Sequence, residues 1–264
     1  MQSAVVIPTY NEAVALPTLL DRLLQWAPTF HVLIVDDNSP DGTGRIADDY
    51  AAANDTVSVL HRPGKMGLGS AYRHGFQHAL DAGYEAIFEM DADHSHNPRH
   101  LPALLDCLEN DADVAIGSRY VNGVRVDNWP FRRLLLSRFA NIYVNLATGL
   151  PASLVSDATS GYRGYHRKVL EAIGLNQVRS NGYSFQIEMA YRAWRLGFRV
   201  KEVPITFEEH YLTSSKISRS IILEAIWRTP LLRFTTPQRK QPRPEARRGS
   251  DTSRPMHDHG NLET

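Results

Sequence analysis

The chain has 264 residues, of which 42% are hydrophobic and 22% charged, a composition typical of a soluble globular protein. Its 29 basic and 29 acidic residues give a formal net charge of zero, so no global field attracts the protein to nucleic acid, and we expect no nucleic-acid partner. The single cysteine, Cys107, excludes an internal disulfide and fits a reducing compartment.

Strand-like and helical runs alternate along the first 120 residues. The expected strands are residues 4–8, 31–35, 57–60, 86–90 and 113–117, and the expected helices end at about residues 26, 52, 80 and 110. Short connections between alternating strands and helices predict an α/β fold with a doubly wound, mostly parallel sheet and flanking helices. In such a sheet, ligands bind beyond the carboxyl ends of the strands.

Each of these expected strands ends in a polar cluster. The clusters are residues 8–12, 36–37, 62–69, 91–93 and 117–119. Because the carboxyl ends of parallel strands meet at one edge, we expect the clusters to share one rim. The first helix lacks a Gly-x-Gly-x-x-Gly opening and the chain has no Walker loop, which argues against a dinucleotide dehydrogenase and against a P-loop enzyme.

Asp91 and Asp93 follow the fourth expected strand and stand one residue apart. Side chains at i and i+2 point to the same face of an extended segment, and two carboxylates aimed at one point repel each other unless a cation lies between them. Oxygen ligands in a partly open site suit Mg²⁺ or Mn²⁺ that carries substrate phosphates, although a lone Asp-x-Asp is also common in turns. His94, His96 and His100 suggest zinc as an alternative, which the lack of nearby cysteines disfavours.

The second half of the chain has a different pattern. We expect helices at residues 128–150, 167–173, 182–196 and 216–232, a strand at 199–207 and a polar loop at 156–165. Residues 1–235 are expected to form the folded domain, and residues 236–264, rich in proline and arginine, a disordered tail.

The helices expected at residues 128–150 and 216–232 mix arginine or tryptophan with long apolar side chains. This pattern is typical of helices that lie in a membrane interface, and ordinary packing against the sheet is the alternative. No apolar run reaches the length that crossing a bilayer requires.

Several motifs, taken together, resemble the family 2 inverting glycosyltransferases of GT-A fold. Within that family they are most similar to the polyprenol (dolichol) phosphate mannose synthases, and the resemblance covers about residues 3–230. The motifs are residues 5–12, 35–43, 90–98, 117–120, 157–163, 182–189 and 215–216. The resemblance implies that residues 1–235 are a GT-A catalytic domain with C-terminal helices at the membrane interface.

The resemblance also implies roles for individual residues. Those implied to bind the nucleotide sugar are Pro8, Tyr10, Glu12, Val35, Asp37, Asp91, Ala92, Asp93, His210 and Lys216. Those implied to hold Mg²⁺ or Mn²⁺ are Asp91, Asp93 and Ser95, and those implied to act in catalysis are Asp93, Arg119 and Arg133, with both arginines gripping the acceptor phosphate. The chain departs from the family at Ser95, where relatives carry a glutamine ligand, at His210, where arginine is usual, and at Thr213, where glycine is usual.

The implied reaction is transfer of mannose from GDP-mannose to polyprenyl (dolichyl) monophosphate with inversion, giving polyprenyl phosphate β-mannose. A polyprenyl monophosphate is already anionic at neutral pH, so its attack needs positioning by arginines more than it needs a general base. Two alternatives stay open. One is glucose transfer from UDP-glucose to the same lipid, and the other is a protein that binds a nucleotide sugar without catalysis.

A lipid acceptor implies a membrane surface as partner, reached by the protein itself or through a membrane-anchoring subunit. The N-terminus enters a strand-like run without the basic and apolar regions of a signal peptide. We therefore expect a cytoplasmic protein that binds peripherally to the cytoplasmic face of the membrane.

Overall fold

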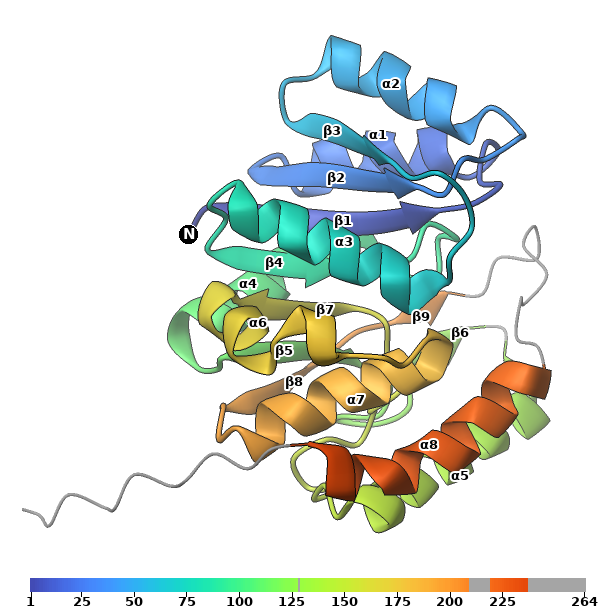
Figure 1. The fold of residues 1–264 in the computed structure, drawn as a ribbon, viewed down its shortest axis with the longest axis vertical. Coiled ribbons are helices and arrows are strands. Elements are labelled where there is room, and N and C mark those ends of the chain that lie inside the picture. The colour runs from blue at the N-terminus through green and yellow to red at the C-terminus, as the bar shows by residue number, and fades with distance from the viewer. Residues whose placement is uncertain (128, 209–218, 237–264) are drawn as a thin grey trace, which may run out of the picture.

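Seven strands form one sheet in the order β3-β2-β1-β4-β7-β5-β8 (Figure 1), in a computed structural model that describes residues 1–127, 129–208 and 219–236. Their bounds are β1 Ser3–Thr9, β2 Phe30–Asp36, β3 Val57–His61, β4 Ala86–Glu89, β5 Val114–Ser118, β7 Arg163–His166 and β8 Val200–Pro204. Neighbouring strands are parallel except where β7 pairs with β4 and with β5. The predicted mostly parallel sheet is confirmed.

Strand β7 lies where the sequence was expected to form a polar loop, so the expected loop over residues 156–165 is wrong from Arg163 onward. The strand is short, and none of its residues is β-branched, so the usual signal of a buried strand is absent. Gly164 permits the close fit, because a Cβ there would lie 2.4 Å from Cε1 of Phe88 on β4.

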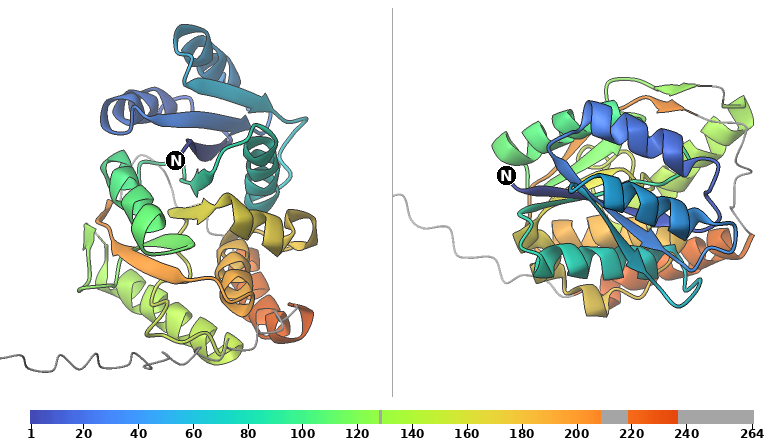
Figure 2. Two further views of the ribbon diagram at one scale, coloured as in Figure 1. Left: turned by 90° about the vertical axis from the view of Figure 1, so that its left-hand side faces the viewer. Right: turned by 90° about the horizontal axis from the view of Figure 1, so that it is seen from above.

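Helices cover both faces of the sheet (Figure 2). One face carries α3 Leu68–Asp81, α6 Arg167–Ile173 and α7 Gly182–Arg195, and the other carries α1 Leu16–Trp26, α2 Thr43–Ala53 and α4 Leu101–Asn110. Two short 3-10 helices, η1 Pro98–His100 and η2 Leu175–Gln177, precede α4 and α7.

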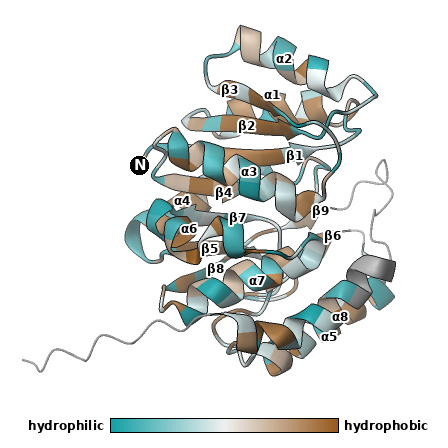
Figure 3. Cartoon of the chain, in the orientation of Figure 1, coloured by the Kyte–Doolittle hydropathy of each residue, from teal (hydrophilic) through white to brown (hydrophobic). Residues whose placement is uncertain are grey.

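Side chains of β1 alternate between two cores, with Val6 packed on the α3 side and Val5 and Ile7 on the α1 side. Strands β1 and β2 are hydrophobic along most of their length in Figure 3, as expected of parallel strands buried on both faces. The doubly wound arrangement is confirmed.

Two further helices, α5 Phe131–Thr148 and α8 Arg219–Thr235, pack against each other beyond β8 (Figure 1). The Tyr143 hydroxyl on α5 donates to the carbonyl oxygen of Ile226 on α8 at 2.7 Å. Helix α5 begins later than expected because Pro130 precedes its first turn. The expected tail from residue 237 onward lies outside the described residues and stays a prediction.

The strand expected at residues 199–207 is divided in two. Strand β8 ends at Pro204, which cannot donate a backbone hydrogen bond, and the chain resumes pairing in β9 Phe207–Glu208. Strand β9 pairs with β6 Val126–Asp127 in a second, two-stranded sheet.

Helices α5 and α8 leave large apolar side chains exposed to solvent, and most recur at three- or four-residue spacing, which places them on one stripe of each helix. The α5–α8 apolar surface comprises Phe131, Leu135, Leu136, Phe139, Ile142, Leu146, Trp227, Leu231 and Phe234. Packing against the sheet does not account for these exposed side chains. No helix in the described ranges is both long and apolar enough to cross a bilayer.

Gly75 on α3 lies directly against β1 and β2. A Cβ at this position would lie 2.3 Å from Val6 Cγ1 and 2.9 Å from Val35 Cγ2. We expect Gly75→Ala to lower the free energy of unfolding by about 1–3 kcal/mol, because the helix must shift away from the sheet. Thermal denaturation measures the effect.

Gly64→Ala is the matched control, since a Cβ there would meet nothing within 4 Å. We expect its free energy of unfolding to stay within about 0.5 kcal/mol of wild type. Equal melting temperatures for the two variants would contradict the packing described for α3.

Candidate functional site

The acidic pair follows the end of β4, at the carboxyl edge of the sheet. The Tyr72 hydroxyl on α3 donates to Asp91 Oδ1 at 2.7 Å, and the Ser95 backbone N–H donates to Asp93 Oδ1 at 3.0 Å. Gly161 leaves room beside the pair, because a Cβ there would lie 3.2 Å from Asp91 Oδ2. Both carboxylates are thus held by neighbouring donors before any ligand is bound.

The electrostatics of the pair favour a bound cation. Burial, followed by the negative charge of Asp93, raises the pKa of Asp91 to about 7. A divalent ion between the two carboxylates would offset this repulsion. Within the described residues, no group of three or more His, Cys, Asp or Glu side chains could hold a metal.

The pair therefore fits a Mg²⁺ or Mn²⁺ ion that keeps positions open for phosphate oxygens and water. Ser95 is buried next to the pair, and its expected role as a ligand stays a prediction.

His96 is positioned as a structural residue beneath the pair. Its ring stacks on Tyr162 with 4.9 Å between centroids, and its Nδ1 accepts the Asp91 backbone N–H at 3.4 Å. Burial lowers the pKa of His96 to about 4, which keeps the ring neutral and able to accept this hydrogen bond.

The residues expected to bind the nucleotide lie at the ends of β1 and β2. The Lys65 ammonium lies 4.3 Å from the centroid of the Tyr10 ring, and the Glu12 backbone N–H donates to Thr43 Oγ1 at 2.9 Å. The carboxylate of Glu12 also contributes to the raised pKa of Asp91, so the first strand's loop and the acidic pair are within electrostatic reach of each other.

Asp37 forms an ion pair with Arg62, a residue to which the sequence analysis assigned no role. Arg62 Nη1 lies 2.8 Å from Asp37 Oδ1, and both side chains are buried. Pro8 and Val35 occupy neighbouring strands, paired in the β1–β2 register. The Val35 side chain is fully buried in the core on the α3 side, so any contact with a nucleotide is left to its backbone.

Across the rim, Arg119 is held by a buried carboxylate. Arg119 Nε donates to Asp157 Oδ2 at 2.7 Å and Nη2 donates to Asp157 Oδ1 at 2.5 Å, a bidentate pair. Burial by itself lowers the pKa of Arg119, but the charge of Asp157 outweighs burial and raises this pKa above its usual range. The same pairing lowers the pKa of Asp157 despite its burial.

Arg133 and Arg119 meet on the indole of Trp129. The guanidinium carbons lie 4.5 Å and 5.3 Å from the Trp129 ring centroid, so the structure brings the two expected arginines together. The indole Nε1 is buried and has no hydrogen-bond partner within the described chain.

Arg163, the first residue of β7, is buried and holds the loop that precedes the strand. It donates to the carbonyl oxygens of Ser160 at 2.8 Å and of Ala158 and Gln186 at 2.7 Å each. Arg163 therefore fixes the loop that carries Asp157 and Gly161.

Tyr183, in the first turn of α7, links the two sides of the rim. Burial raises the pKa of its phenol, and the charges of Arg119 and Arg133 lower it while those of Asp91 and Asp93 raise it. The phenol is therefore within electrostatic reach of both the acidic pair and the arginines.

The sequence interpretation missed Tyr183, together with Tyr72, Trp129 and Arg62. Arg62 and Tyr183 lie within a polar cluster and a motif that the sequence analysis names, whereas Tyr72 and Trp129 lie outside them. His210, Thr213 and Lys216 lie outside the described residues, so the departures from the family pattern in that loop stay predictions.

The model of the family described as Glycosyl transferase family 2 matches residues 4–174. The chain belongs to this family. Among curated relatives, it is 51% identical over 228 residues to the polyprenol monophosphomannose synthase of Mycolicibacterium smegmatis, covering 86% of this chain and 85% of the relative. It is 47% identical over 226 residues to the undecaprenyl-phosphate mannosyltransferase of Micrococcus luteus, covering 86% of this chain and 91% of the relative. The resemblance seen in the motifs is confirmed, and the protein is a glycosyltransferase.

Solved structures of lower identity share the fold. A crystal structure of a mycobacterial protein superposes with a TM-score of 0.62 at 18% identity, covering 90% of this chain and 76% of that chain. The mannosyltransferase PcManGT from Pyrobaculum calidifontis, solved with GDP-Man and Mn²⁺, superposes with a TM-score of 0.53 at 16% identity, covering 89% of this chain and 72% of that chain. The predicted GT-A fold is confirmed.

Tyr72→Phe tests how Asp91 is held. Loss of the hydroxyl removes the hydrogen bond that orients Asp91 Oδ1. Because such supporting contacts typically contribute 10–100-fold to metal affinity, we expect the dissociation constant for Mn²⁺ to rise by about tenfold. Titration followed by electron paramagnetic resonance of free Mn²⁺ measures it.

Tyr50→Phe is the control, since it also removes a hydroxyl that binds an aspartate, Asp21, on the α1–α2 side of the fold. We expect its Mn²⁺ affinity to equal that of wild type. Unchanged affinity in Tyr72→Phe would show that Tyr72 does not position the ligand.

Asp157→Asn tests the buried ion pair. The substitution keeps the shape of the side chain but leaves the Arg119 charge buried without its counter-ion. We expect the free energy of unfolding to fall by about 3–5 kcal/mol, measured by urea denaturation. Glu171→Gln breaks the exposed pair with Arg167 and should cost no more than about 0.5 kcal/mol. Similar losses in both variants would contradict this account of Arg119.

Proposed function

We propose that the protein transfers mannose from GDP-mannose to a polyprenyl monophosphate, with inversion at the sugar carbon. The observation that supports the proposal is that the Asp91–Asp93 pair and the Arg119–Arg133 pair both lie within electrostatic reach of the Tyr183 phenol. The names of the two relatives, a polyprenol monophosphomannose synthase and an undecaprenyl-phosphate mannosyltransferase, support the donor sugar and the acceptor class.

The donor side of the proposed site handles the leaving diphosphate. Asp91 and Asp93 would hold Mg²⁺ or Mn²⁺, which stabilises the charge that develops on GDP as it leaves. Tyr72 orients Asp91, and the Ser95 backbone N–H orients Asp93. Pro8, Tyr10, Glu12 and Asp37 line the rim where the nucleoside is expected.

The acceptor side handles a second anion. Arg133 stacks on Trp129, and its planar guanidinium suits bidentate binding of a phosphate. Asp157 occupies Nε and Nη2 of Arg119, so this arginine would meet the acceptor chiefly through its remaining charge and Nη1. Because the acceptor oxygen is already anionic, the arginines need only place it opposite the leaving group, and no general base is required.

The α5–α8 apolar surface supports a membrane-bound acceptor. Arginines and a tryptophan flank exposed leucine and phenylalanine side chains on these two helices, the composition of helices that lie in a membrane interface. We propose that the protein docks through this surface on the cytoplasmic face of the membrane, directly or beside a membrane-anchoring subunit.

A radiolabelled donor assay with polyprenyl phosphate tests the function. We expect turnover with GDP-mannose and little with UDP-glucose, and a β-linked mannosyl phosphate by NMR coupling constants. Asp93→Ala should lower turnover by about 100-fold or more, because a ligand of the metal is lost. Asp55→Ala, which removes an exposed acid ahead of β3, should keep wild-type turnover.

Three outcomes would overturn parts of the proposal. Preference for UDP-glucose would make the protein a glucosyltransferase. Thermal stabilisation by GDP-mannose without turnover on any lipid phosphate would make it a binding protein. Wild-type turnover in Asp93→Ala would remove the metal from the mechanism.

A further inference from the structure

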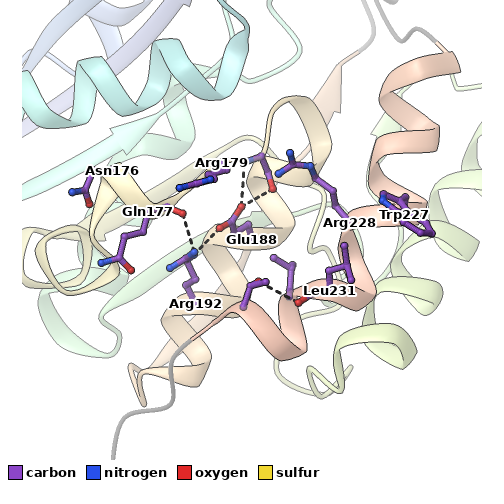
Figure 4. Close-up of a pocket in the computed structure, with 11 residues that line it drawn as sticks. Asn176, Gln177, Arg179, Glu188, Arg192, Trp227, Arg228 and Leu231 are labelled. Carbon is purple, nitrogen blue, oxygen red and sulfur yellow. Dashed lines mark hydrogen bonds and ion pairs between the residues drawn. The ribbon is translucent and has the colours of Figure 1, made fainter.

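A cleft of about 810 Å³ opens between α7 and α8 (Figure 4), and its lining does not include the acidic pair. Basic side chains and an apolar wall line it. The basic side chains are Arg179, Arg192 and Arg228, the acidic one is Glu188, and the apolar wall includes Trp227 and Leu231. No role in the proposed transfer has been assigned to any of these residues.

At the floor of the cleft, the charges of Glu188 and Arg192 neutralise each other. Glu188 is buried and accepts hydrogen bonds from Arg192 Nε at 2.7 Å and from Ser180 Oγ at 2.5 Å. Arg192 Nη2 also donates to the carbonyl oxygen of Gln177 at 3.1 Å. Arg192 and Glu188 therefore balance each other, and the positive charge that remains belongs to the rim.

Two arginines supply that charge. Arg179 is exposed and makes no ion pair with any residue in the described ranges, and Arg228 is partly exposed beside Glu224, with 3.3 Å between Nε and Oε1. Figure 4 shows Arg228 reaching from α8 toward the side of the cleft that carries Arg179. With Glu224 counted beside Arg228, three arginines stand against two glutamates, so the cleft keeps a net positive charge and an anion is the complementary ligand.

The apolar wall is continuous with the α5–α8 apolar surface, because Trp227 and Leu231 belong to both. Trp227 is 75% exposed. Tryptophan prefers the boundary between acyl chains and headgroups, which would place the mouth of the cleft at the depth of lipid phosphates when the surface is docked.

We propose that the α7–α8 cleft binds the phosphodiester headgroup of an anionic membrane phospholipid, gripped by Arg179 and Arg228. The proposal rests on the membrane docking given under the proposed function. It concerns a bulk lipid and not the acceptor, because the lining of the cleft includes neither the Asp91–Asp93 pair nor the Arg119–Arg133 pair. The chain's own residues 237–264 carry more basic than acidic side chains, so they are a poor complement to the cleft.

Vesicle co-sedimentation of the full chain tests the proposal, using phosphatidylcholine vesicles with and without phosphatidylglycerol. We expect wild type to prefer vesicles with phosphatidylglycerol, and the double variant Arg179→Gln, Arg228→Gln to lose about tenfold of its affinity for them. Binding to pure phosphatidylcholine should not change. The lysine pair Arg179→Lys, Arg228→Lys should keep part of the preference, because the charge stays.

The matched control is Arg132→Gln, Arg138→Gln, which removes two charges from α5 outside the cleft. If this control loses as much affinity as the cleft variant, diffuse charge accounts for the preference and the proposal is wrong. Absence of any preference in wild type would also overturn it. Equal protection of the cleft by inorganic phosphate and by short-chain phosphatidylglycerol, followed by NMR, would show a free-anion site and remove the lipid.

A vesicle-free transfer assay with a short, water-soluble polyprenyl phosphate separates the two proposals. The cleft variant should keep wild-type turnover there, since no bilayer is involved. Failure of wild type to transfer mannose would contradict the proposed function and would not affect the result of the vesicle experiment. Loss of turnover in the cleft variant alone would place the cleft in the transfer site and overturn its role as a bulk-lipid site.

Discussion

Repulsion between Asp91 and Asp93 is the constraint on which the rest of the site depends. The end of β4 places both carboxylates at the rim, and burial together with the second charge raises the pKa of Asp91 to about 7. Keeping both carboxylates charged in a buried place costs free energy unless a cation accompanies the substrate. Donors from α3 and from the turn after the pair orient the carboxylates, so binding of a metal with its phosphates would need little rearrangement.

On the proposed acceptor side, buried charged side chains fix the position of a loop. Glu202 on β8 accepts the backbone N–H groups of Ser156 and Asp157 at 3.0 Å and 2.7 Å, and Asp157 in turn grips Arg119. A buried ion pair rarely adds much net stability, because desolvation offsets the attraction. Its value here is geometric, since it sets the guanidinium of Arg119 against the ring of Trp129 at a defined place on the rim.

The sequence predicted those parts of the structure that local pattern controls. Apolar runs predicted the parallel strands, and the polar residues after these runs predicted the rim on which the acidic pair and Arg119 lie. Strand β7 escaped prediction because it is short and polar and is stabilised by partners distant in sequence, such as Phe88 against Gly164. Tyr72 and Tyr183 escaped for the same reason, since their roles arise from tertiary contacts that no spacing reveals.

Helix α5 contributes both to the proposed membrane docking and to the proposed placement of the acceptor. Residues two apart on a helix differ by about 200°, so Phe131 and Arg133 face nearly opposite directions. Phe131 is 75% exposed on the α5–α8 apolar surface, while Arg133 turns inward onto Trp129. One turn of helix thus presents an apolar side chain to the proposed bilayer and the proposed phosphate-binding side chain to the site. A lipid phosphate gripped by Arg133 would keep its prenyl chain on the apolar side, so membrane docking and acceptor placement follow from the same helix orientation.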